Sequence, residues 1–462
     1  MPSRAATTLE PDSSSSASRD VADTLFPLPF TPFEFYYLVE DRPDYASAFP
    51  IHLECRGPLD RRAFGRAFRS THARHPFLAA GIDYDRRGWP NWVAGEAPTI
   101  LWQDEPNRSA PRRESVATSG GLQIRIRQDG DRTRWTFVFQ HVAVDGMGAF
   151  LFISDLFVAY AHYCSGTTEP PTWRVLDPLR LRDRDGHNLF SGKVKFRDLM
   201  RLVRVTLPLN IRRAAVVSCH DQPIPDAVSD GSQTDDLVHL LTEDETTELS
   251  RVAGTLSVML NDLLMRDYFL ALAAWNSGTS EARRPIRVMV PTNLRRRVDY
   301  RMPAANVFSF AFLSRRLRDC ENRVTLLATI RDEMATVKRQ KRGVYFEAAL
   351  RLFCLWPALL RWSLKRPWPF ATAIFSNLGT GLDNIPLPEC EGRRLCGDLV
   401  FHGGSGAAPI RPDTRVSVAI HTYAGRLAIC VRSDPRQFTA EQQRALLESY
   451  VAQLRTTIAS ES

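Results

Sequence analysis

The segment between residues 133 and 163 changes its hydrophobic period within a few positions, and this change limits the folds that the chain can adopt. Up to residue 141, large apolar side chains alternate with polar ones, which is typical of a β-strand with one buried face. From residue 147, apolar side chains recur at helical spacing. A strand that leads directly into a helix indicates a fold built from both kinds of element. The buried face of the strand is predicted to carry Trp135, Phe137, Phe139 and His141.

The rest of the chain has the same mixed pattern, and we therefore predict an α/β (α+β) fold. In the first half we expect a strand over 49–55 and a helix that begins after Asp60. In the second half we expect helices over 243–276, 321–340, 343–363 and from Thr439 to about 458, strands over 286–291, 305–313, 371–377 and 397–402, and a hairpin over 414–433 turning at Ala424 and Gly425. One apolar stripe is expected to face the core: Tyr345, Ala348, Leu352, Trp356 and Leu359.

Length and composition favour two lobes. The chain has 462 residues, of which 44% are hydrophobic, enough for a packed core. The Ser-rich N-terminus lacks the apolar region of a secretory signal, and no stretch has the roughly 18 apolar residues of a membrane span. The eight cysteines form no CxxC pair, so we expect a cytoplasmic protein with free thiols. We predict a disordered tail over 1–23, an N-terminal lobe over 24–180, an inter-lobe connection over 181–236 and a C-terminal lobe over 237–462.

Basic residues exceed acidic ones, so an anionic partner is expected. Lys and Arg number 60 against 52 Asp and Glu, which gives a formal net charge of +8. The basic segments 194–213 and 335–366 are expected to form solvated helix faces. The alternative is a surface for CoA phosphates, an acidic carrier protein or a peripheral membrane contact. Nucleic acid is not expected, because regularly interleaved aromatic residues and known binding motifs are missing.

The junction between the predicted strand and helix reads Gln140-His141-Val142-Ala143-Val144-Asp145-Gly146. A histidine at this place could take a proton from a hydroxyl or amine nucleophile near neutral pH. Asp145 directly precedes the helix, where an aspartate side chain commonly caps the first backbone N–H groups. The pattern alone is therefore compatible with a catalytic base and equally with a strand histidine followed by an ordinary helix cap.

Further short motifs occur in a fixed order along the chain. They are Gly57-Pro58-Leu59-Asp60 with Arg74-His75-Pro76-Phe77-Leu78, then Asn261-Asp262-Leu263-Leu264, Pro291-Thr292-Asn293-Leu294-Arg295 and Ser376-Asn377-Leu378-Gly379. Together with the HxxxDG segment, and over nearly all of the chain after residue 24, they resemble the HxxxD acyltransferase superfamily. This superfamily includes peptide-synthetase condensation domains, chloramphenicol acetyltransferase, alcohol acetyltransferases and wax ester synthases.

The resemblance implies two chloramphenicol-acetyltransferase-like lobes around a central tunnel. His141 would be the general base of an acyltransferase. Asp145 would hold its loop by pairing with an arginine, for which Arg295, supported by Asn293, is the matching residue, and Gly146 would let the backbone approach the tunnel. Ser376, Asn377 and Gln140 would line the tunnel or donate to the developing oxyanion. The resemblance implies no metal and no bound cofactor, with acyl-CoA or a phosphopantetheine thioester as co-substrate.

Two departures narrow this expectation. The first histidine of the condensation-domain pair is replaced by Gln140, and the plant-type DFGWG segment is absent. We therefore expect a stand-alone acyltransferase that moves an acyl group from a CoA or carrier-protein thioester to an alcohol or amine acceptor. The alternatives are a catalytically inactive condensation-like binding or scaffold protein and a nonribosomal-peptide-type condensation enzyme.

The segment from Phe401 to Ala407 offers a competing interpretation as a serine hydrolase. Its FHGGSGA sequence fails the G-x-S-x-G pattern because position 407 is Ala. We expect a Gly-rich loop between strands there, with His402 as a further candidate for the tunnel wall. His421 lies in an apolar strand and is expected to be a packed or edge residue.

Overall fold

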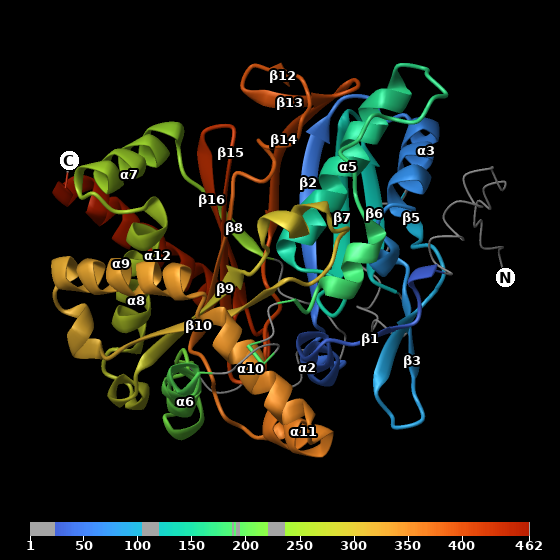
Figure 1. The fold of residues 1–462 in the computed structure, drawn as a ribbon. Helices are drawn as coiled ribbons and strands as arrows, with labels where there is room; N and C mark the ends of the chain where they lie inside the picture. Colours follow the sequence, from blue (N-terminus) through green and yellow to red (C-terminus); the bar gives the residue numbers. More distant parts are fainter. Residues whose placement is uncertain (1–23, 104–119, 187–188, 191–194, 220–235, 462) are drawn as a thin grey trace.

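Two mixed β-sheets form the centres of two lobes that lie side by side (Figure 1). The structure is a computed structural model that describes residues 24–103, 120–186, 189–190, 195–219 and 236–461. The tail predicted over 1–23 lies outside the described residues. The combination of helices and mixed sheets confirms the predicted α/β (α+β) class.

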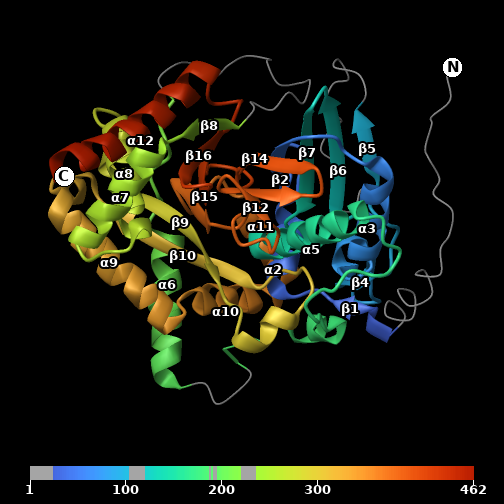
Figure 2. The ribbon, with the colours of Figure 1, turned by 90° about the horizontal axis from the view of Figure 1, so that it is seen from above.

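The first sheet has the strand order β12-β13-β14-β2-β7-β6-β5. Its strands are β2 (Ala48–Arg56), β5 (Ile100–Gln103), β6 (Leu122–Asp129), β7 (Arg132–Gln140), β12 (Glu389–Cys390), β13 (Arg393–Cys396) and β14 (Leu399–Gly406). Helices α3 (Arg61–His72) and α5 (Gly146–Cys164) pack on this sheet and share one apolar core with it (Figure 2). The strand and helix predicted around the HxxxDG junction are thereby confirmed. Helix α5 is long and apolar enough to span a membrane, but it serves as the core helix of this lobe.

The second sheet has the order β10-β9-β11-β15-β16-β8. Its strands are β8 (Leu237–Leu240), β9 (Ile286–Asn293), β10 (Phe308–Arg315), β11 (Ala373–Gly379), β15 (Val416–Tyr423) and β16 (Arg426–Ser433). Helices α7 (Glu243–Thr255), α8 (Leu260–Asn276), α9 (Arg323–Gln340) and α12 (Ala440–Glu461) cover its outer face in Figure 1. The predicted hairpin turn is present, with positive φ at Ala424 and Gly425. Thr439 caps α12, as expected, by accepting a hydrogen bond from Gln442 N.

A short aromatic helix, α2 (Pro32–Glu40), packs between the two sheets. Thr31 and Glu34 form a capping box at its start. Phe33 and Tyr37 contact Phe308 of β10, and the three rings belong to one apolar core shared by both lobes. Beside α2 lies a small sheet, β1 (Leu28–Pro29), β4 (Pro90–Val93) and β3 (Gly81–Tyr84). Sequence analysis did not predict α2 as a helix.

Two long helices predicted in the second half are each broken. The helix expected over 243–276 is α7 followed by α8, and Ser257 between them has a φ of 52°. The helix expected over 343–363 is α10 (Gly343–Cys354) and α11 (Pro357–Lys365), which meet at 115°. Pro357 lacks the N–H that would continue a helix, so a new helix begins at this residue. The expected core stripe is right at two of its five positions: Tyr345 and Ala348 are buried, but Leu352, Trp356 and Leu359 are exposed.

The chain crosses between the lobes late in the sequence. Strand β14 pairs antiparallel with β2, so residues 389–406 complete the sheet of the first lobe. A division of the chain at residue 237 therefore does not separate the two sheets, because strand pairing follows free edges rather than sequence position. The predicted connection contains α6 (Phe196–Ile211), while 220–235 lies outside the described residues. Short 3-10 helices lie at Pro76–Leu78, Pro178–Asp183, Ser280–Arg283, Arg297–Arg301 and Leu317–Cys320.

Candidate active site

The HxxxDG segment lies where β7 ends and α5 begins, at the boundary between the two lobes. Asp145 is the N-cap residue of α5, and its Oδ1 accepts a hydrogen bond from Gly148 N at 2.8 Å. This is the ordinary capping role that the pattern allowed. It fixes the direction in which the chain leaves His141.

The same Asp145 carboxylate forms the ion pair that the resemblance implied. Arg295 Nη1 lies 2.8 Å from Oδ2 and Nη2 lies 3.0 Å from Oδ1, a bidentate geometry. Val307 N also donates to Oδ2 at 2.8 Å, and Asn293 Oδ1 accepts from Arg295 N at 3.0 Å. The two bonds from Arg295, the bond from Val307 N and the capping bond from Gly148 N occupy the four acceptor positions of the carboxylate. Asp145 therefore joins the loop of the first lobe to the second lobe and has no lone pair left for His141.

His141 is held between aromatic rings. Its imidazole stacks on Tyr37 at a centroid distance of 4.4 Å and on Phe308 at 5.0 Å, and Phe49 lies 4.8 Å away. The backbone is fixed as well, because His141 N donates to Ser47 O at 2.8 Å and Asn306 Nδ2 donates to His141 O at 2.6 Å. The ring therefore has one orientation, set by residues from both lobes.

Burial keeps this imidazole neutral. It lowers the pKa of His141 to about 4, and the charge of Asp145 offsets only part of that effect. The ring atom Nδ1 is buried and forms no hydrogen bond of standard geometry among the described residues, although the Asn306 side chain and the backbone at His141 and Val144 lie close enough to raise the pKa slightly. Near neutral pH the ring thus has a free lone pair, which is the first requirement of a general base.

A cavity of about 440 Å³ adjoins His141. Its wall combines residues of the first lobe, such as Tyr37 and Ser47, with Pro291, Phe310 and Ile374 from the second sheet. Cavities that contain a titratable group and join two lobes are frequent sites of ligand binding. His141 is thus placed in a hollow between the lobes.

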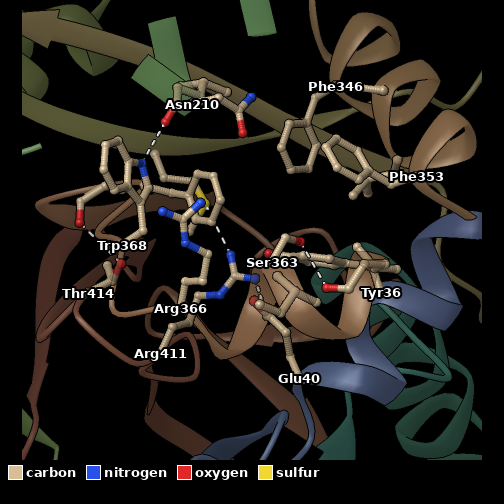
Figure 3. Close-up of a pocket in the computed structure, with 18 of the residues that line it drawn as sticks. Tyr36, Glu40, Asn210, Phe346, Phe353, Ser363, Arg366, Trp368, Arg411 and Thr414 are labelled. Atoms are coloured by element: carbon tan, nitrogen blue, oxygen red, sulfur yellow. Dashed lines mark hydrogen bonds and ion pairs between the residues drawn. The ribbon is translucent and has the colours of Figure 1, made fainter. Parts of the chain in front are cut away.

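A second, larger pocket of about 960 Å³ lies next to the first. Its wall is mainly apolar and aromatic, with Phe346 and Phe353 of α10 on one side and Trp368 on another (Figure 3). The two cavities have four lining residues in common: Glu40, Met289, Arg411 and Pro412. They are therefore neighbouring compartments at the same boundary between the lobes.

An ion pair stands where the two compartments meet. The Arg411 guanidinium pairs with the Glu40 carboxylate and lies 4.9 Å from the ring centre of Tyr36 (Figure 3). Burial lowers the pKa of Arg411 to about 9 and raises the pKa of Glu40. Sequence analysis missed this pair, because Arg411 lies between β14 and β15 outside any motif.

The remaining candidates of the resemblance lie at different distances from the cavity. Ser376 is on the same face of β11 as Ile374, one step beyond the cavity wall. Asn377 is exposed, and its Nδ2 donates to Asn261 Oδ1 at 3.0 Å, on the other face. Gln140 is buried and does not line either cavity. Of the predicted oxyanion donors, only Ser376 lies on the face that carries the cavity.

Two glycines follow His141, and the second is the more tightly packed. A Cβ on Gly146 would meet only the side chain of Leu378, at 3.4 Å. A Cβ on Gly148 would lie 2.6 Å from Val144 Cγ2 and 3.0 Å from the backbone N of Ala305. The tightest backbone packing is therefore at Gly148, which sequence analysis did not select, and the approach of Gly146 to a tunnel stays a prediction.

The competing hydrolase segment does not join the cavity. The expected loop at 401–407 is largely strand β14, and His402 is exposed at a bulge beside Arg393. His402, a candidate for the tunnel wall, thus lines neither cavity. His421 is buried in β15, as expected of a packed residue. No group of three or more His, Cys, Asp or Glu within the described ranges could hold a metal ion.

Comparison with known proteins places the fold. No family model matches the sequence, and none of the curated proteins matches it. The first condensation domain of the CDA synthetase superposes with a TM-score of 0.70 at 16% identity, over 94% of this chain and 97% of that chain. The chain has the condensation-domain fold. This fold confirms the predicted two chloramphenicol-acetyltransferase-like lobes, and it confirms the resemblance at the level of the fold.

Two further structures share the condensation-domain fold. The starter condensation domain of rhizomide synthetase RzmA, in complex with C8-CoA, gives a TM-score of 0.69 at 14% identity, over 96% of this chain and 98% of that chain. Polyketide synthase associated protein 5 from Mycobacterium tuberculosis gives 0.65 at 15% identity, over 95% and 100%. All three cover nearly the whole chain at low identity, so they establish the architecture of both lobes.

Proposed function

We propose that the protein is a condensation-type acyltransferase in which His141 is the general base. The acceptor, an alcohol or amine, gives a proton to the imidazole while its oxygen or nitrogen attacks the carbonyl of an acyl thioester. The tetrahedral intermediate then collapses, the C–S bond breaks, and the thiol leaves with a proton. The observation that carries the proposal is a neutral imidazole in the wall of a cavity between two lobes.

The donor is proposed to be a thioester of CoA or of phosphopantetheine on a carrier protein. One neighbour was solved with C8-CoA and another is a four-domain nonribosomal peptide synthetase, which supports both donor types. The net charge of +8 favours a phosphate-bearing donor through electrostatic attraction. No bound cofactor or metal is needed for this reaction.

The apolar pocket of about 960 Å³ is proposed to hold the hydrocarbon part of a substrate. Its reacting end would then lie in the smaller cavity, past Arg411 and Glu40. Each buried methylene contributes about 0.8 kcal/mol, so the pocket would select for chain length. The pocket residue Ala349 offers a direct test, because Ala349→Phe would fill part of the space.

The central experiment measures thiol release from a series of acyl-CoAs with alcohol and amine acceptors. We expect His141→Ala to lower kcat/KM by about 10²- to 10⁴-fold. The matched control is His402→Ala, an exposed histidine outside both cavities, which should leave kcat/KM unchanged. Equal rates for wild type and His141→Ala, with both folded, would remove the base assignment.

Chain-length selection is tested in the same assay. Ala349→Phe is expected to reduce kcat/KM for long acyl chains about tenfold while leaving short chains nearly unchanged. Ala335→Phe, an exposed alanine on α9, is the control for the added ring. Binding of acyl-CoA without turnover in wild type, for every acceptor, would instead favour the inactive binding protein. Turnover only with carrier-bound aminoacyl acceptors would favour the peptide-type condensation enzyme.

A further inference from the structure

Helices α6 and α11 lie at the lower end of the molecule in Figure 1, and both expose large apolar side chains. More than half of the large apolar side chains that are exposed among the described residues belong to α6 or to the segment 352–362. An apolar concentration of this kind on a surface commonly marks an interaction site.

Helix α6 has two apolar faces. Leu202 is buried against Tyr345 and Ala348 of α10, which accounts for one face. The second face is exposed along its full length, and its members are spaced by three or four residues, so they form one row. The row consists of Phe196, Met200, Val203, Leu207 and Ile211.

The segment 352–362 adds a second exposed apolar group. Trp356 is 62% exposed and Trp362 is 56% exposed, and Leu355 and Leu359 lie beside them. Three residues of this segment, Leu352, Trp356 and Leu359, belong to the predicted core stripe but do not reach the core. The bent pair α10–α11 also has the length and apolar composition of a broken span or re-entrant segment. Tryptophan and leucine on one side of a short helix are typical of helices that lie in a membrane interface.

Cations accompany both groups. Arg361, Lys365 and Arg366 lie on or just after α11, and residues 352–368 include no Asp or Glu. On α6, Arg197 and Arg204 are exposed. Within the described part of the chain, none of these five side chains forms an ion pair with a carboxylate. The exposed apolar surface is thus bordered by unneutralised positive charge.

We propose that the exposed row on α6 and residues 352–366 together form a docking face. This docking face binds the surface of an anionic lipid bilayer. The tryptophans and leucines would enter the headgroup region, and the arginines and Lys365 would contact lipid phosphates. A second copy of the chain fits this face poorly, because a twofold contact would place the same cations opposite one another. The positive charge of this face is complementary to an anionic bilayer and not to a second copy of the same face.

The docking face also borders the apolar pocket. Thr206 and Asn210 of α6 line the pocket, as do Ser363 and Leu364 of α11 (Figure 3). If the proposed acyl transfer holds, a lipid chain could pass from the bilayer into this pocket without crossing water. Bilayer binding itself does not depend on that activity and can be measured without any acyl donor.

The test is co-sedimentation of the full chain with vesicles of phosphatidylcholine, with and without about a third phosphatidylserine. We expect binding to the anionic vesicles, weaker binding to the neutral ones, and release by high salt. Trp356→Ser with Trp362→Ser should weaken the partition at least about tenfold. Arg361→Glu with Lys365→Glu should abolish the preference for phosphatidylserine. The matched control is Val324→Ser, which changes an exposed valine on α9.

Three results would overturn the proposal. The first is no binding of wild type to either vesicle. The second is equal loss in the tryptophan variant and in Val324→Ser. The third is a dimer in sedimentation velocity that Trp356→Ser with Trp362→Ser converts to monomer while vesicles bind neither form. Acyl transfer from a soluble donor, assayed in parallel, separates failure of membrane binding from failure of the proposed function.

Discussion

His75 and His141 both lie at landmarks of the family resemblance, His75 fully buried and His141 partly buried, and they differ in what their rings contact. The His75 Nδ1 accepts a hydrogen bond from Ala304 N at 3.0 Å, so its hydrogen lies on Nε2, 3.3 Å from Asp155 Oδ2. His141 has an unpartnered Nδ1 and adjoins a cavity. Burial lowers the pKa of both rings. A lowered pKa therefore does not distinguish a reactive histidine from a structural one, whereas a place in the wall of a cavity does.

The largest effects are expected from removing each histidine in turn. His141→Ala should abolish most activity with little change in the free energy of unfolding. His75→Ala should lower that free energy by about 2–4 kcal/mol, because it leaves a cavity and removes the acceptor of the Ala304 N–H. The folded fraction of His75→Ala should keep its kcat within about twofold. Urea unfolding and kcat/KM are measured on the same samples. Equal losses of stability and of activity in the two variants would contradict the division into a reactive and a structural histidine.

The next effect concerns the ion pair that positions the His141 loop. Asp145→Ala removes the partner of a nearly buried arginine and four hydrogen bonds, so we expect a loss of about 3–5 kcal/mol in the free energy of unfolding. Arg295→Ala in the same chain should recover part of this loss, since no buried charge is then left unpaired. Asp332→Ala, in an exposed pair with Arg331, should cost under about 1 kcal/mol. Additive losses for Asp145 and Arg295 would contradict the pairing.

The sequence predicted the parts of this site that depend on local pattern. Alternation and helical spacing locate β7 and α5, and Asp145 before the apolar helix predicts its cap. The partner Arg295 came from the family resemblance, since 150 residues separate it from Asp145. Local patterns cannot supply such a pairing, because it arises only when the two lobes meet.

The parts that sequence analysis missed are long-range contacts without a motif. Tyr37 and Phe308, which hold the His141 ring, are distant in the chain, and Arg411 and Glu40 are 371 positions apart. The breaks after Thr255 and before Pro357 were missed because the apolar spacing continues across both. Pro357 was the available signal for the second break. Strand β14 joins the other lobe because β2 has a free edge there, which no periodicity can reveal.

A smaller effect is expected from the two glycines after His141, because Gly148 is tightly packed and Gly146 is not. Gly148→Ala should cost about 1–3 kcal/mol of unfolding free energy, because the new methyl group meets Val144 and the Ala305 backbone. Gly146→Ala should change it by under about 1 kcal/mol. Thermal unfolding of the two variants measures the difference. A larger loss of unfolding free energy for Gly146→Ala than for Gly148→Ala would contradict this difference in packing.

The smallest effect is expected from moderate acidification. A histidine with the ordinary pKa would lose about fourfold in its neutral fraction between pH 7.5 and pH 6. With the pKa lowered to about 4, His141 stays neutral over this range, so kcat/KM should change by less than about 1.2-fold. Stability should nevertheless fall below about pH 6.5, because the unfolded chain then binds protons that the buried histidines of the folded state do not. Circular dichroism at each pH must therefore accompany the rates, and an acid limb with a midpoint near 6.5 in fully folded protein would contradict a buried, neutral base.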